Sequence, residues 1–330
     1  MSNIVVILSP TNEGSEIRMK ESQDAAEQVG QIDLRIVDSE QSFDDVAEQC
    51  QGAVVVVPHG KYDELTKLAE KIGSLKLVQT PSAGTDWIDK AALAELGVDV
   101  ANNGGANAVA VAEHAIGLMF STNRKLDVQI ESVKQGTWMA GVEGDRTEFH
   151  TLVGKRIGII GLGRIGSRVA KRLAGWECEL IYHDIIDHPA DYVAATGAKK
   201  VSLEELISTS DIITLHVPLD RVTTHMMSDR EFEKMKPTSI LINTCRGPVV
   251  DENALIRALE SKEIFAAGLD VTEIEPIESD NPLPTMPNVV ITPHLATRAL
   301  ESELNAAQFT MENAGRVVRG KAADWIVKPV

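Results

Sequence analysis

The chain has 330 residues, which is enough for two domains that each bury a core of their own. Hydrophobic residues make up 43% of it but aromatic residues only 4%, so we expect cores built mainly from Val, Ile, Leu and Ala. The formal net charge of −17 argues against nucleic acid and anionic membranes as partners.

The N-terminal third alternates short apolar runs with amphipathic ones. We expect strands at 4–8, 33–37, 53–57, 75–79 and 98–101, and helices at 15–29, 42–50, 63–72 and 86–96. Such alternation predicts a parallel, doubly wound sheet. The first strand runs into Ser9-Pro10-Thr11, which lacks the glycines of a nucleotide-binding turn, so this part is not expected to bind a dinucleotide.

A stretch of small residues, 80–86, follows the fourth of these strands and precedes a helix. Exposed backbone N–H groups in such a stretch can bind a carboxylate. The alternative is an ordinary strand-to-helix turn in which Thr85 or Asp86 caps the helix, and the residues alone favour it. Asn102-Asn103-Gly104-Gly105 then breaks the pattern and is the first candidate domain boundary.

Residues 107–134 have the apolar periodicity of one long helix. His114 lies inside it, and we assign no chemistry to it because a single His in an apolar helix is usually structural. The following loop, 136–152, is longer than most connections, so it is expected to cover part of the protein.

The strongest motif in the chain is a nucleotide-binding fingerprint. An apolar strand at 156–160 is followed by Gly161, Gly163 and Gly166 at G-x-G-x-x-G spacing and by a helical pattern. The first glycine permits a tight turn, the second lets backbone approach a pyrophosphate, and the third lets the helix pack on the strand. The helix N-terminus then holds the phosphates.

A second strand, at 179–183, ends on Asp184, 18 residues after the third glycine. A carboxylate in this position accepts hydrogen bonds from the adenosine ribose hydroxyls and repels a 2′-phosphate. The next residues, Ile185 and Ile186, offer no cation to such a phosphate. The fingerprint therefore predicts an NAD site.

After Asp184 the alternation resumes and continues towards the end of the chain. We expect strands at 211–215, 239–243, 264–269 and 289–291, and helices at 202–208, 229–235, 251–261 and 299–319. In an open parallel sheet, ligands bind outside the carboxyl ends of the strands. The polar residues just past these ends are His216, Arg246, Asp270, Glu275 and His294.

An Arg, a Glu and a His beside a nicotinamide point to the reduction of a 2-keto acid. A His supplies the proton for the carbonyl oxygen near neutral pH. A hydrogen-bonded carboxylate orients the imidazole and favours its protonated form. An Arg binds the substrate carboxylate through two parallel N–H groups.

The cysteines and the hydropathy of the chain indicate the cellular location of the protein. Cys50, Cys178 and Cys245 are widely spaced and form no C-x-x-C, so we expect reduced thiols and no metal site. No signal peptide is visible, and no apolar run approaches the roughly 18 residues of a membrane span. We therefore expect a soluble, cytoplasmic protein.

Several motifs taken together resemble those of the D-isomer-specific 2-hydroxyacid dehydrogenase family over nearly the whole chain. They are AVAEH at 110–114, GLGRIG at 161–166, LHVPL at 215–219, INTCRGPVVDE at 242–252, AGLDV at 267–271 and TPH at 292–294. The resemblance implies an NAD-dependent enzyme in which Arg246 binds the substrate, Glu275 is the partner carboxylate and His294 is the acid/base.

The same resemblance assigns the rest of the binding site. It implies that backbone N–H groups of Ser82, Ala83 and Gly84 bind the substrate carboxylate, in place of the ordinary turn considered above. The residues expected to contact the cofactor are Gly161, Gly163, Arg164, Ile165, Gly166, Asp184, His216, Pro218, Thr244, Cys245, Asp270 and His294.

The resemblance also implies the domain layout. Family members are α/β proteins with two doubly wound parallel-sheet, Rossmann-like domains, of which the substrate domain is discontinuous. We place the substrate domain at 1–103 and 298–330, and the NAD-binding domain at 104–297. Members are typically homodimers through the cofactor domain, so the helix at 107–134 and the loop after it are the expected interface.

The sequence departs from the family pattern at two places. Position 245 is Cys where Ala or Ser is more common, and Leu295-Ala296-Thr297-Arg298 replaces a run of small residues that includes Gly. Both places lie near the expected substrate position. The resemblance therefore does not identify which 2-hydroxy acid is used.

Three alternatives compete with this interpretation. A formate dehydrogenase of the same superfamily carries Gln in place of Glu275, which argues against it. A dehydrogenase of a dianionic hydroxy acid, of 3-phosphoglycerate or sulfolactate type, would use extra cations such as Arg298 and Lys61; otherwise Arg298 pairs with a carboxylate such as Glu301 and Lys61 is solvated. An NAD(H)-sensing, corepressor-like binding protein shares the fold, and NADH oxidation with 2-keto acids would distinguish it.

Overall fold

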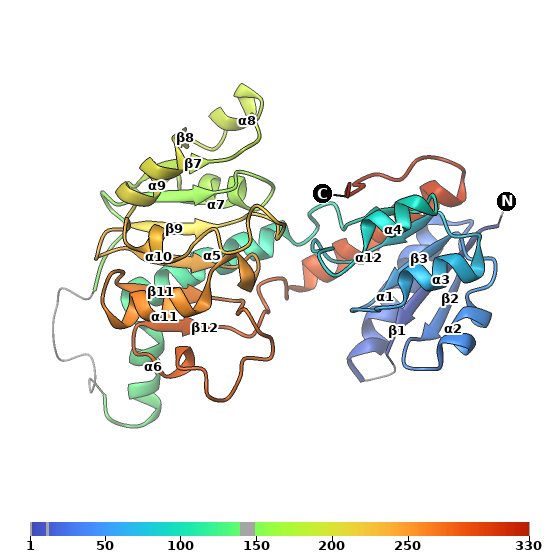
Figure 1. Ribbon diagram of the computed structural model, residues 1–330, viewed down its shortest axis with the longest axis horizontal. Helices are drawn as coiled ribbons and strands as arrows, with labels where there is room; N and C mark the ends of the chain where they lie inside the picture. Colours follow the sequence, from blue (N-terminus) through green and yellow to red (C-terminus); the bar gives the residue numbers. More distant parts are fainter. Residues whose placement is uncertain (1, 11–12, 139–148, 330) are drawn as a thin grey trace. The chain divides into compact units, whose positions relative to one another are not determined.

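The computed structural model describes residues 2–10, 13–138 and 149–329. The chain divides into two compact units, the first made of Met1–Asn107 with Arg298–Val330 and the second of Ala108–Thr297. Each unit is an α/β structure with one parallel sheet (Figure 1). The prediction of two parallel-sheet α/β domains is therefore confirmed.

The first unit includes the turn that follows Asn103, whereas the boundary predicted from the sequence places this turn in the second domain. The N–H of Asn102 donates to the carbonyl of Trp325 (3.2 Å). The ring of Trp325 also covers Gly104, where an added Cβ would lie 2.7 Å from the indole Nε1. These contacts within the unit hold the turn, so the division falls after Asn107.

The first unit is a five-stranded parallel sheet in the order β2-β1-β3-β4-β5. Its elements are β1 (Ile4–Ser9), α1 (Glu13–Val29), β2 (Asp33–Asp38), α2 (Phe43–Gln49), β3 (Val55–Pro58), α3 (Leu65–Ile72), β4 (Leu77–Gln79), α4 (Lys90–Glu95), β5 (Asp99–Ala101) and α12 (Leu300–Val318). Side chains alternate across the sheet, so Val6 and Leu8 face the core under α2, α3 and α4. Val5 and Ile7 face the opposite core, under α1 and α12.

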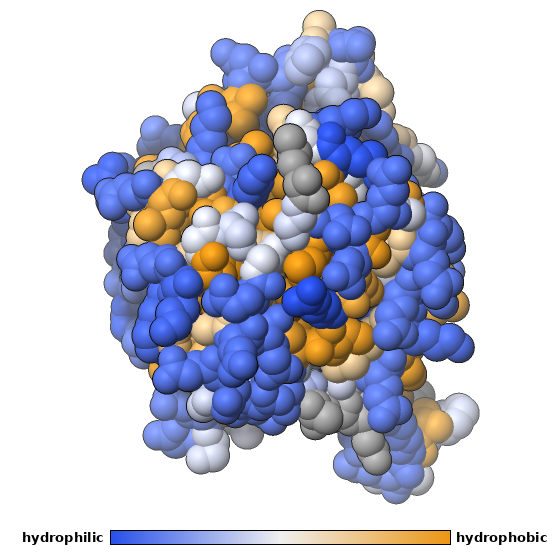
Figure 2. All heavy atoms as spheres, turned by 90° about the vertical axis from the view of Figure 1, so that its right-hand side faces the viewer, coloured by the Kyte–Doolittle hydropathy of each residue, from blue (hydrophilic) through white to orange (hydrophobic). Residues whose placement is uncertain are grey.

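The closing helix α12 returns to the first unit. Its residues Ala307, Met311 and Ala314 are buried in the same core as Val5 and Ile7 of β1. This packing makes the first unit discontinuous in sequence, as predicted. Figure 2 looks onto the side of the molecule where β1 and β2 are labelled in Figure 1, and hydrophilic side chains predominate on it.

The second unit is a seven-stranded parallel sheet in the order β12-β11-β10-β9-β6-β7-β8. Its elements are α5 (Ala108–Arg124), α6 (Leu126–Lys134), β6 (Arg156–Ile160), α7 (Gly166–Leu173), β7 (Glu179–His183), α8 (Ala190–Ala194), β8 (Lys199–Lys200), α9 (Leu203–Thr209), β9 (Ile212–Leu215), α10 (Asp229–Phe232), β10 (Ile240–Asn243), the 3-10 turn η2 (Gly247–Val249), α11 (Glu252–Glu260), β11 (Ala266–Leu269), the 3-10 turn η3 (Leu283–Thr285) and β12 (Val289–Ile291). Helices α5 and α7 cover one face of the sheet, and α9, α10 and α11 cover the other. The strand order reverses between β6 and β9, which marks the position where such sheets bind ligands.

The helix predicted at 107–134 is two helices. Lys125 separates α5 from α6 and has left-handed backbone angles (φ 48°, ψ 47°). Near the end of α5, the carbonyl of Asn123 accepts the N–H of His150 (3.1 Å), and its side-chain amide donates to the His150 carbonyl (3.0 Å). This long-range pair satisfies backbone groups at the helix end, so the local periodicity did not reveal the break. Most of the loop predicted at 136–152 lies outside the described residues, at 139–148.

Two further differences concern short elements. The helix predicted at 86–96 begins only at Lys90, because Asp89 caps it by accepting the N–H of Ala92 (3.0 Å). Neither α8 nor β8 was predicted, since five and two residues are too short to show a periodicity.

Within the parts of the chain that the structure describes, no helix combines the length and apolar character needed to cross a membrane. Within the same ranges, no group of three or more His, Cys, Asp or Glu side chains is placed to hold a metal ion.

Candidate active site

The loop between β6 and α7 approaches neighbouring backbone closely at Gly161 and Gly166 and is open at Gly163. Gly161 has φ +90°, and a Cβ on it would lie 2.5 Å from the carbonyl oxygen of His216. A Cβ on Gly166 would lie 2.0 Å from the carbonyl oxygen of Gly161, so helix α7 packs directly on the turn. Gly163 faces open space, because nothing lies within 4 Å of its added Cβ.

Asp184 lies beside this loop, at the carboxyl end of β7. Its Oδ2 accepts the N–H of Leu162 (2.7 Å) and lies 3.0 Å from His188 Nε2, while its Oδ1 accepts the N–H of Ile186 (2.8 Å). Burial raises the pKa of Asp184, but the hydrogen bonds from Ile186, His188 and Leu162 outweigh burial and hold that pKa below its usual range. An ionised carboxylate has about four acceptor positions, so one is left for a ligand.

These residues fit a dinucleotide. Gly163 leaves room for close approach, and Asp184 keeps an acceptor position next to it. Two buried polar atoms at the neighbouring strand ends, Thr244 Oγ1 and His216 Nδ1, have no hydrogen-bond partner among the described residues. Buried polar atoms of this kind are usually paired, so a bound group is expected to satisfy them.

The remaining residues of the predicted cofactor set lie along the same edge of the sheet. Ile165 is the last residue before α7, and Arg164 precedes it on the loop surface. Pro218 follows β9, and its carbonyl accepts the hydroxyl of Thr223 (2.7 Å).

His216 and Cys245 are unsuited to proton transfer or nucleophilic attack. Burial lowers the pKa of His216 to about 3, so its ring stays neutral at any working pH. Burial raises the pKa of Cys245 to about 11, and its thiol donates to Asn243 Oδ1 (3.0 Å). Both residues can contact a ligand without reacting with it.

His294 and Glu275 form a hydrogen-bonded pair. His294 Nδ1 lies 2.7 Å from Glu275 Oε2, and Glu275 Oε1 accepts the N–H of Thr272 (3.2 Å). His294 has left-handed backbone (φ +53°), and its N–H donates to the carbonyl of Asp270 (2.8 Å). Because Nδ1–H is directed at the carboxylate, Nε2 is the nitrogen left for a substrate, and the side chain is 40% exposed.

Asp270 holds the segment that carries His294. Its carboxylate is only 1% exposed and accepts hydrogen bonds from Thr292 Oγ1 (2.6 Å), the N–H of Leu295 (3.0 Å) and the N–H of Ala296 (2.8 Å). These donors all belong to the protein itself. The geometry therefore gives this side chain a positioning role, and its contact with the cofactor stays a prediction.

His114 is a part of the site that the sequence analysis set aside. Its Nε2 lies 2.8 Å from Thr292 Oγ1 and 3.4 Å from Asp270 Oδ1. The hydroxyl of Thr292 has one proton, which it donates to Asp270, so it must accept the Nε2–H of His114. A residue 178 positions earlier in the chain thus supports the His294 segment, and no local pattern indicates this.

Arg246 follows β10, next in the sheet to β11 and therefore near the Glu275 loop. Its backbone carbonyl accepts the side-chain amide of Asn243 (3.0 Å), and its Nη1 donates to the carbonyl of Cys245 (2.7 Å). A Cβ on the next residue, Gly247, would lie 1.8 Å from the carbonyl oxygen of Thr272. Only glycine permits this approach, which brings the Arg246 and Glu275 loops together.

The predicted substrate loop of the first unit has unpaired backbone donors. Among the described residues, no acceptor receives the N–H groups of Ser82, Ala83 and Gly84. The carbonyl of Ser82 is fixed by the Thr80 hydroxyl (2.9 Å) and the Asn103 N–H (3.1 Å). The loop is not the N-terminus of a helix, since α4 begins only at Lys90.

The two extra cations suggested by the sequence have carboxylate partners within the first unit. Arg298 Nη1 lies 3.0 Å from Glu303 Oε1, and Lys61 Nζ lies 3.2 Å from Asp63 Oδ1. Both cations are mostly exposed. This geometry favours ordinary surface ion pairs over a second anion site, with Glu303 in place of the expected Glu301.

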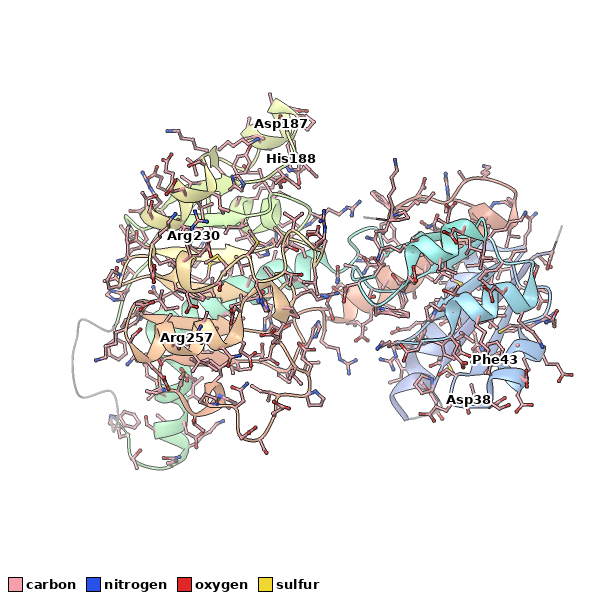
Figure 3. The ribbon with its side chains drawn as sticks, viewed as in Figure 1. Asp38, Phe43, Asp187, His188, Arg230 and Arg257 are labelled. Atoms are coloured by element: carbon pink, nitrogen blue, oxygen red, sulfur yellow. The ribbon has the colours of Figure 1, made fainter. Side chains whose placement is uncertain are left out.

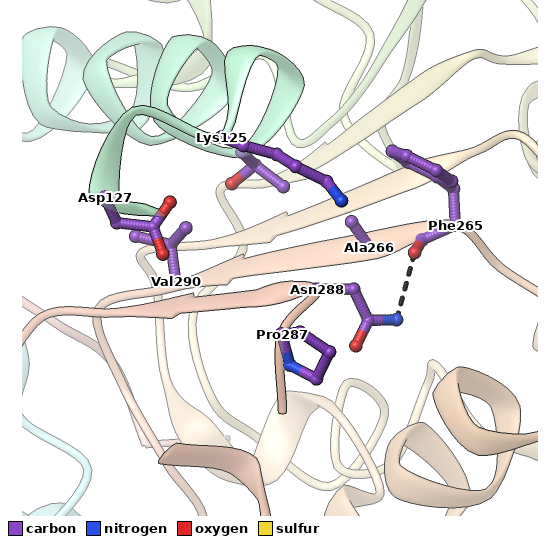
Figure 4. Close-up of a pocket in the computed structure, with 8 residues that line it drawn as sticks. Lys125, Asp127, Phe265, Ala266, Pro287, Asn288 and Val290 are labelled. Carbon is purple, nitrogen blue, oxygen red and sulfur yellow. Dashed lines mark hydrogen bonds between the residues drawn. The ribbon is translucent and has the colours of Figure 1, made fainter. Parts of the chain in front are cut away.

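A small pocket lies at the opposite edge of the second sheet. Figure 4 shows it between Lys125 and the residues at the amino ends of β11 and β12, among them Phe265 and Asn288. Its free volume of about 10 Å³ suits a single water molecule. It is therefore too small for a substrate and lies at the wrong end of the strands.

Comparison with known proteins gives a consistent result. Residues 116–296 match the family described as D-isomer specific 2-hydroxyacid dehydrogenase, NAD binding domain. The chain is 38% identical over 272 residues to a D-3-phosphoglycerate dehydrogenase of Archaeoglobus fulgidus, covering 81% of this chain but only 50% of that relative. It is 36% identical over 254 residues to a glyoxylate reductase of Thermofilum pendens, covering 77% of this chain and 75% of that relative.

Solved structures agree with these sequence matches. The chain resembles the crystal structure of a glyoxylate reductase from Paecilomyes thermophila with a TM-score of 0.84, at 27% identity and 99% coverage of both chains. It resembles the apo-structure of the D-lactate dehydrogenase of Escherichia coli with a TM-score of 0.80, at 28% identity. That likeness covers 98% of this chain and 99% of the other.

Proposed function

The chain belongs to the D-isomer-specific 2-hydroxyacid dehydrogenase family and carries that family's NAD-binding domain. We propose an NAD-dependent oxidoreductase that interconverts a small 2-keto acid and its D-2-hydroxy acid. The observation that carries the proposal is the 2.7 Å contact between His294 and Glu275 at the carboxyl ends of β12 and β11.

His294 acts as the acid and base in this proposal. The bound nicotinamide supplies the hydride, and the protein must supply the proton that completes the hydroxyl group. Glu275 accepts Nδ1–H, which fixes the ring orientation and stabilises the imidazolium, so Nε2–H is the donor to the carbonyl oxygen. In the reverse direction, neutral Nε2 accepts the hydroxyl proton.

Arg246 and the loop at Ser82, Ala83 and Gly84 bind the substrate carboxylate in this proposal. A guanidinium presents two parallel N–H groups to a carboxylate, which orients the substrate as well as attracting it. The unpaired N–H groups of the loop supply further donors. The proposed cofactor contacts are the loop from Gly161 to Gly166 and Asp184, with Thr244 and His216 at the neighbouring strand ends.

We also propose a cytoplasmic location. The cysteines Cys50, Cys178 and Cys245 are all free, which supports a reducing compartment.

Two other functions have less support from the site and from the relatives. A dehydrogenase of a dianionic acid finds support in the phosphoglycerate dehydrogenase relative, but the chain spans half of that protein and both candidate cations have partners. A corepressor-like binding protein would bind NADH without turning over a keto acid.

The first experiment measures NADH oxidation with glyoxylate, pyruvate, hydroxypyruvate, phosphohydroxypyruvate and sulfopyruvate. We expect steady turnover of monoanionic keto acids. Turnover confined to the two dianionic acids would favour the second function, and NADH binding without any turnover would favour the third.

Arg246→Ala should raise KM for the keto acid and lower kcat/KM by roughly a thousandfold, because a charged hydrogen-bonding partner of the carboxylate is lost. Its Kd for NADH should stay within about threefold of wild type, since the side chain acts on substrate. Arg257→Ala is the matched control, because Arg257 is an exposed Arg of α11 paired with Asp229 (2.8 Å) (Figure 3). Equal losses in both variants would contradict the role of Arg246.

A further inference from the structure

The segment between β7 and β8 contains two aromatic rings that the proposed reaction does not use. His188 lies two residues before the short helix α8, and Tyr192 lies in the middle of this helix. Their ring centroids are 5.1 Å apart with an interplanar angle of 27°, so the rings are stacked. Figure 3 shows His188 and its neighbour Asp187 on the segment beyond the end of β7.

His188 contacts the carboxylate that is proposed to bind the ribose. Its Nε2 lies 3.0 Å from Asp184 Oδ2, and the two side chains are only 15% and 10% exposed. The same Oδ2 accepts the N–H of Leu162, so this oxygen has both of its acceptor positions filled. His188 and the glycine loop therefore fix one carboxylate oxygen together, and Oδ1 keeps the acceptor position that remains.

Tyr192 contacts the backbone of the same loop. Its hydroxyl lies 3.2 Å from the carbonyl oxygen of Leu162 and 3.1 Å from that of Gly163, and it donates its single proton to this pair. Its ring also packs against the core beneath the sheet, next to Val193. The ring is therefore a fixed platform from which the hydroxyl holds the loop.

The two residues connect the two halves of the adenosine site. Leu162 donates its N–H to Asp184 and accepts the Tyr192 hydroxyl through its carbonyl, so one peptide segment takes part in both contacts. His188 completes this set of contacts, because it contacts Asp184 and its ring stacks on Tyr192. Hydrogen-bond networks of this kind strengthen one another and hold a single geometry.

The charged side chains near His188 and Tyr192 do not take over their contacts with Asp184 and the glycine loop. Asp187 is paired with Lys200 on β8. Lys171 Nζ, on α7, lies 5.9 Å from the Tyr192 ring centroid, at the limit of a cation–π contact. Among the hydrogen bonds and ion pairs of the described residues, neither Lys171 nor Lys200 contacts Asp184.

We propose that His188 and Tyr192 are positioning residues for NAD(H): together they clasp the glycine loop to Asp184, so that the phosphate-binding backbone and the ribose-binding carboxylate are held in one arrangement before the cofactor binds. This inference rests on the proposed cofactor contacts of Asp184 and the loop. A site held in its bound geometry loses less conformational freedom on binding, and its affinity is correspondingly higher.

The test is direct titration of NADH and of ADP-ribose, which carries the adenosine and phosphate groups without the nicotinamide. His188→Ala should weaken both ligands about tenfold, and Tyr192→Phe, which keeps the ring and removes the hydroxyl, about threefold. The double variant should lose less than the product of these factors, because either change alone opens the clasp. His188→Gln keeps an N–H donor and should bind more tightly than His188→Ala.

Asp187→Asn is the matched control, because it breaks the neighbouring ion pair with Lys200 and leaves the clasp intact. Its affinity for both ligands should equal that of wild type. Hydrogen exchange at 161–166 without ligand should be faster in Tyr192→Phe than in wild type or in the control. At saturating NADH, kcat and the keto-acid KM of His188→Ala should stay within about twofold of wild type.

Three results would overturn the clasp. They are unchanged affinity in His188→Ala, equal weakening in Asp187→Asn, and an affinity of His188→Gln no better than that of His188→Ala. Because the readout is binding, a wild-type protein that binds NADH but reduces no keto acid would refute the proposed function and leave the clasp standing. A wild-type protein that binds neither NADH nor ADP-ribose would refute both.

Discussion

At the scale of single residues, Asp270 fixes the segment that carries His294. Its carboxylate is buried and accepts three hydrogen bonds from the segment on either side of His294. The sequence predicted Asp270 at a strand end, but it could not show that three of its acceptor positions bind donors of the protein itself. A buried carboxylate with such donors acts through the loop it holds.

Asp270→Asn should therefore damage catalysis and stability more than cofactor binding. The amide has one oxygen to offer, so Leu295 or Ala296 loses an acceptor, and the free energy of unfolding should fall by about 2 kcal/mol. We expect kcat to drop at least tenfold while Kd for NADH stays within about threefold. Denaturant unfolding, NADH titration and kcat measured on one preparation check this. Loss of NADH affinity at unchanged kcat would instead make Asp270 a cofactor contact.

Cys245 should be inert although it lies next to Arg246. The thiolate is the reactive form, and burial raises the pKa of this thiol to about 11, so only about one molecule in a thousand is thiolate at pH 8. Alkylation by iodoacetamide, followed by mass spectrometry, should be slow at pH 8 and should speed up only as the pH rises towards 11. Fast modification at pH 7.5 in the folded protein would contradict this. Cys245→Ala should keep activity within about threefold, because no step uses the sulfur.

At the scale of elements, the strands were the easiest part to predict. The central residues of runs such as Arg156–Ile160 and Glu179–His183 are buried and apolar, so local sequence determines these strands. The break at Lys125 depends on the pairing of Asn123 with His150, 27 residues away, which no local pattern contains. Helix α8 was missed because five residues are too short to show a helical period, and the contact of its Tyr192 with Leu162 spans 30 residues.

Helix α6 has an exposed apolar stripe. Leu126, Ile130 and Val133 recur at helical spacing, and Ile130 and Val133 are 54% and 56% exposed. An uncovered stripe of this kind usually marks a protein contact. It supports the homodimer interface that the family resemblance implies for this region.

If the protein forms the homodimer implied by the resemblance, replacing both Ile130 and Val133 by Glu should convert it to a monomer, because four charges would have to be buried in the symmetric contact. Size-exclusion chromatography with light scattering measures this directly. Ile17→Glu is the control, since Ile17 is 64% exposed on α1 in the first unit. A dimer that survives the double change, or a wild-type protein that is monomeric at micromolar concentration, would refute this interface.

At the scale of the whole molecule, sheet topology explains how much of the site the sequence could reveal. Parallel strands bring their carboxyl ends to one edge, so a strand assignment was enough to group Arg246, Glu275 and His294. The supporting contacts were not predictable, since His114 meets Thr292 across 178 residues. Whether Arg298 serves a second substrate anion depends on its side-chain partner, which the sequence does not reveal. In the structure this partner is Glu303.

The most direct test of the central claim is the rate of hydride transfer in His294→Asn, measured by stopped-flow loss of NADH absorbance with a saturating 2-keto acid. Loss of the proton donor should slow this step by roughly 10²–10⁴-fold, while the Kd values for NADH and the keto acid stay near those of wild type. That result would establish His294 as the acid/base of an NAD-dependent reduction. A variant that transfers hydride at the wild-type rate would contradict the mechanism proposed for the His294–Glu275 pair.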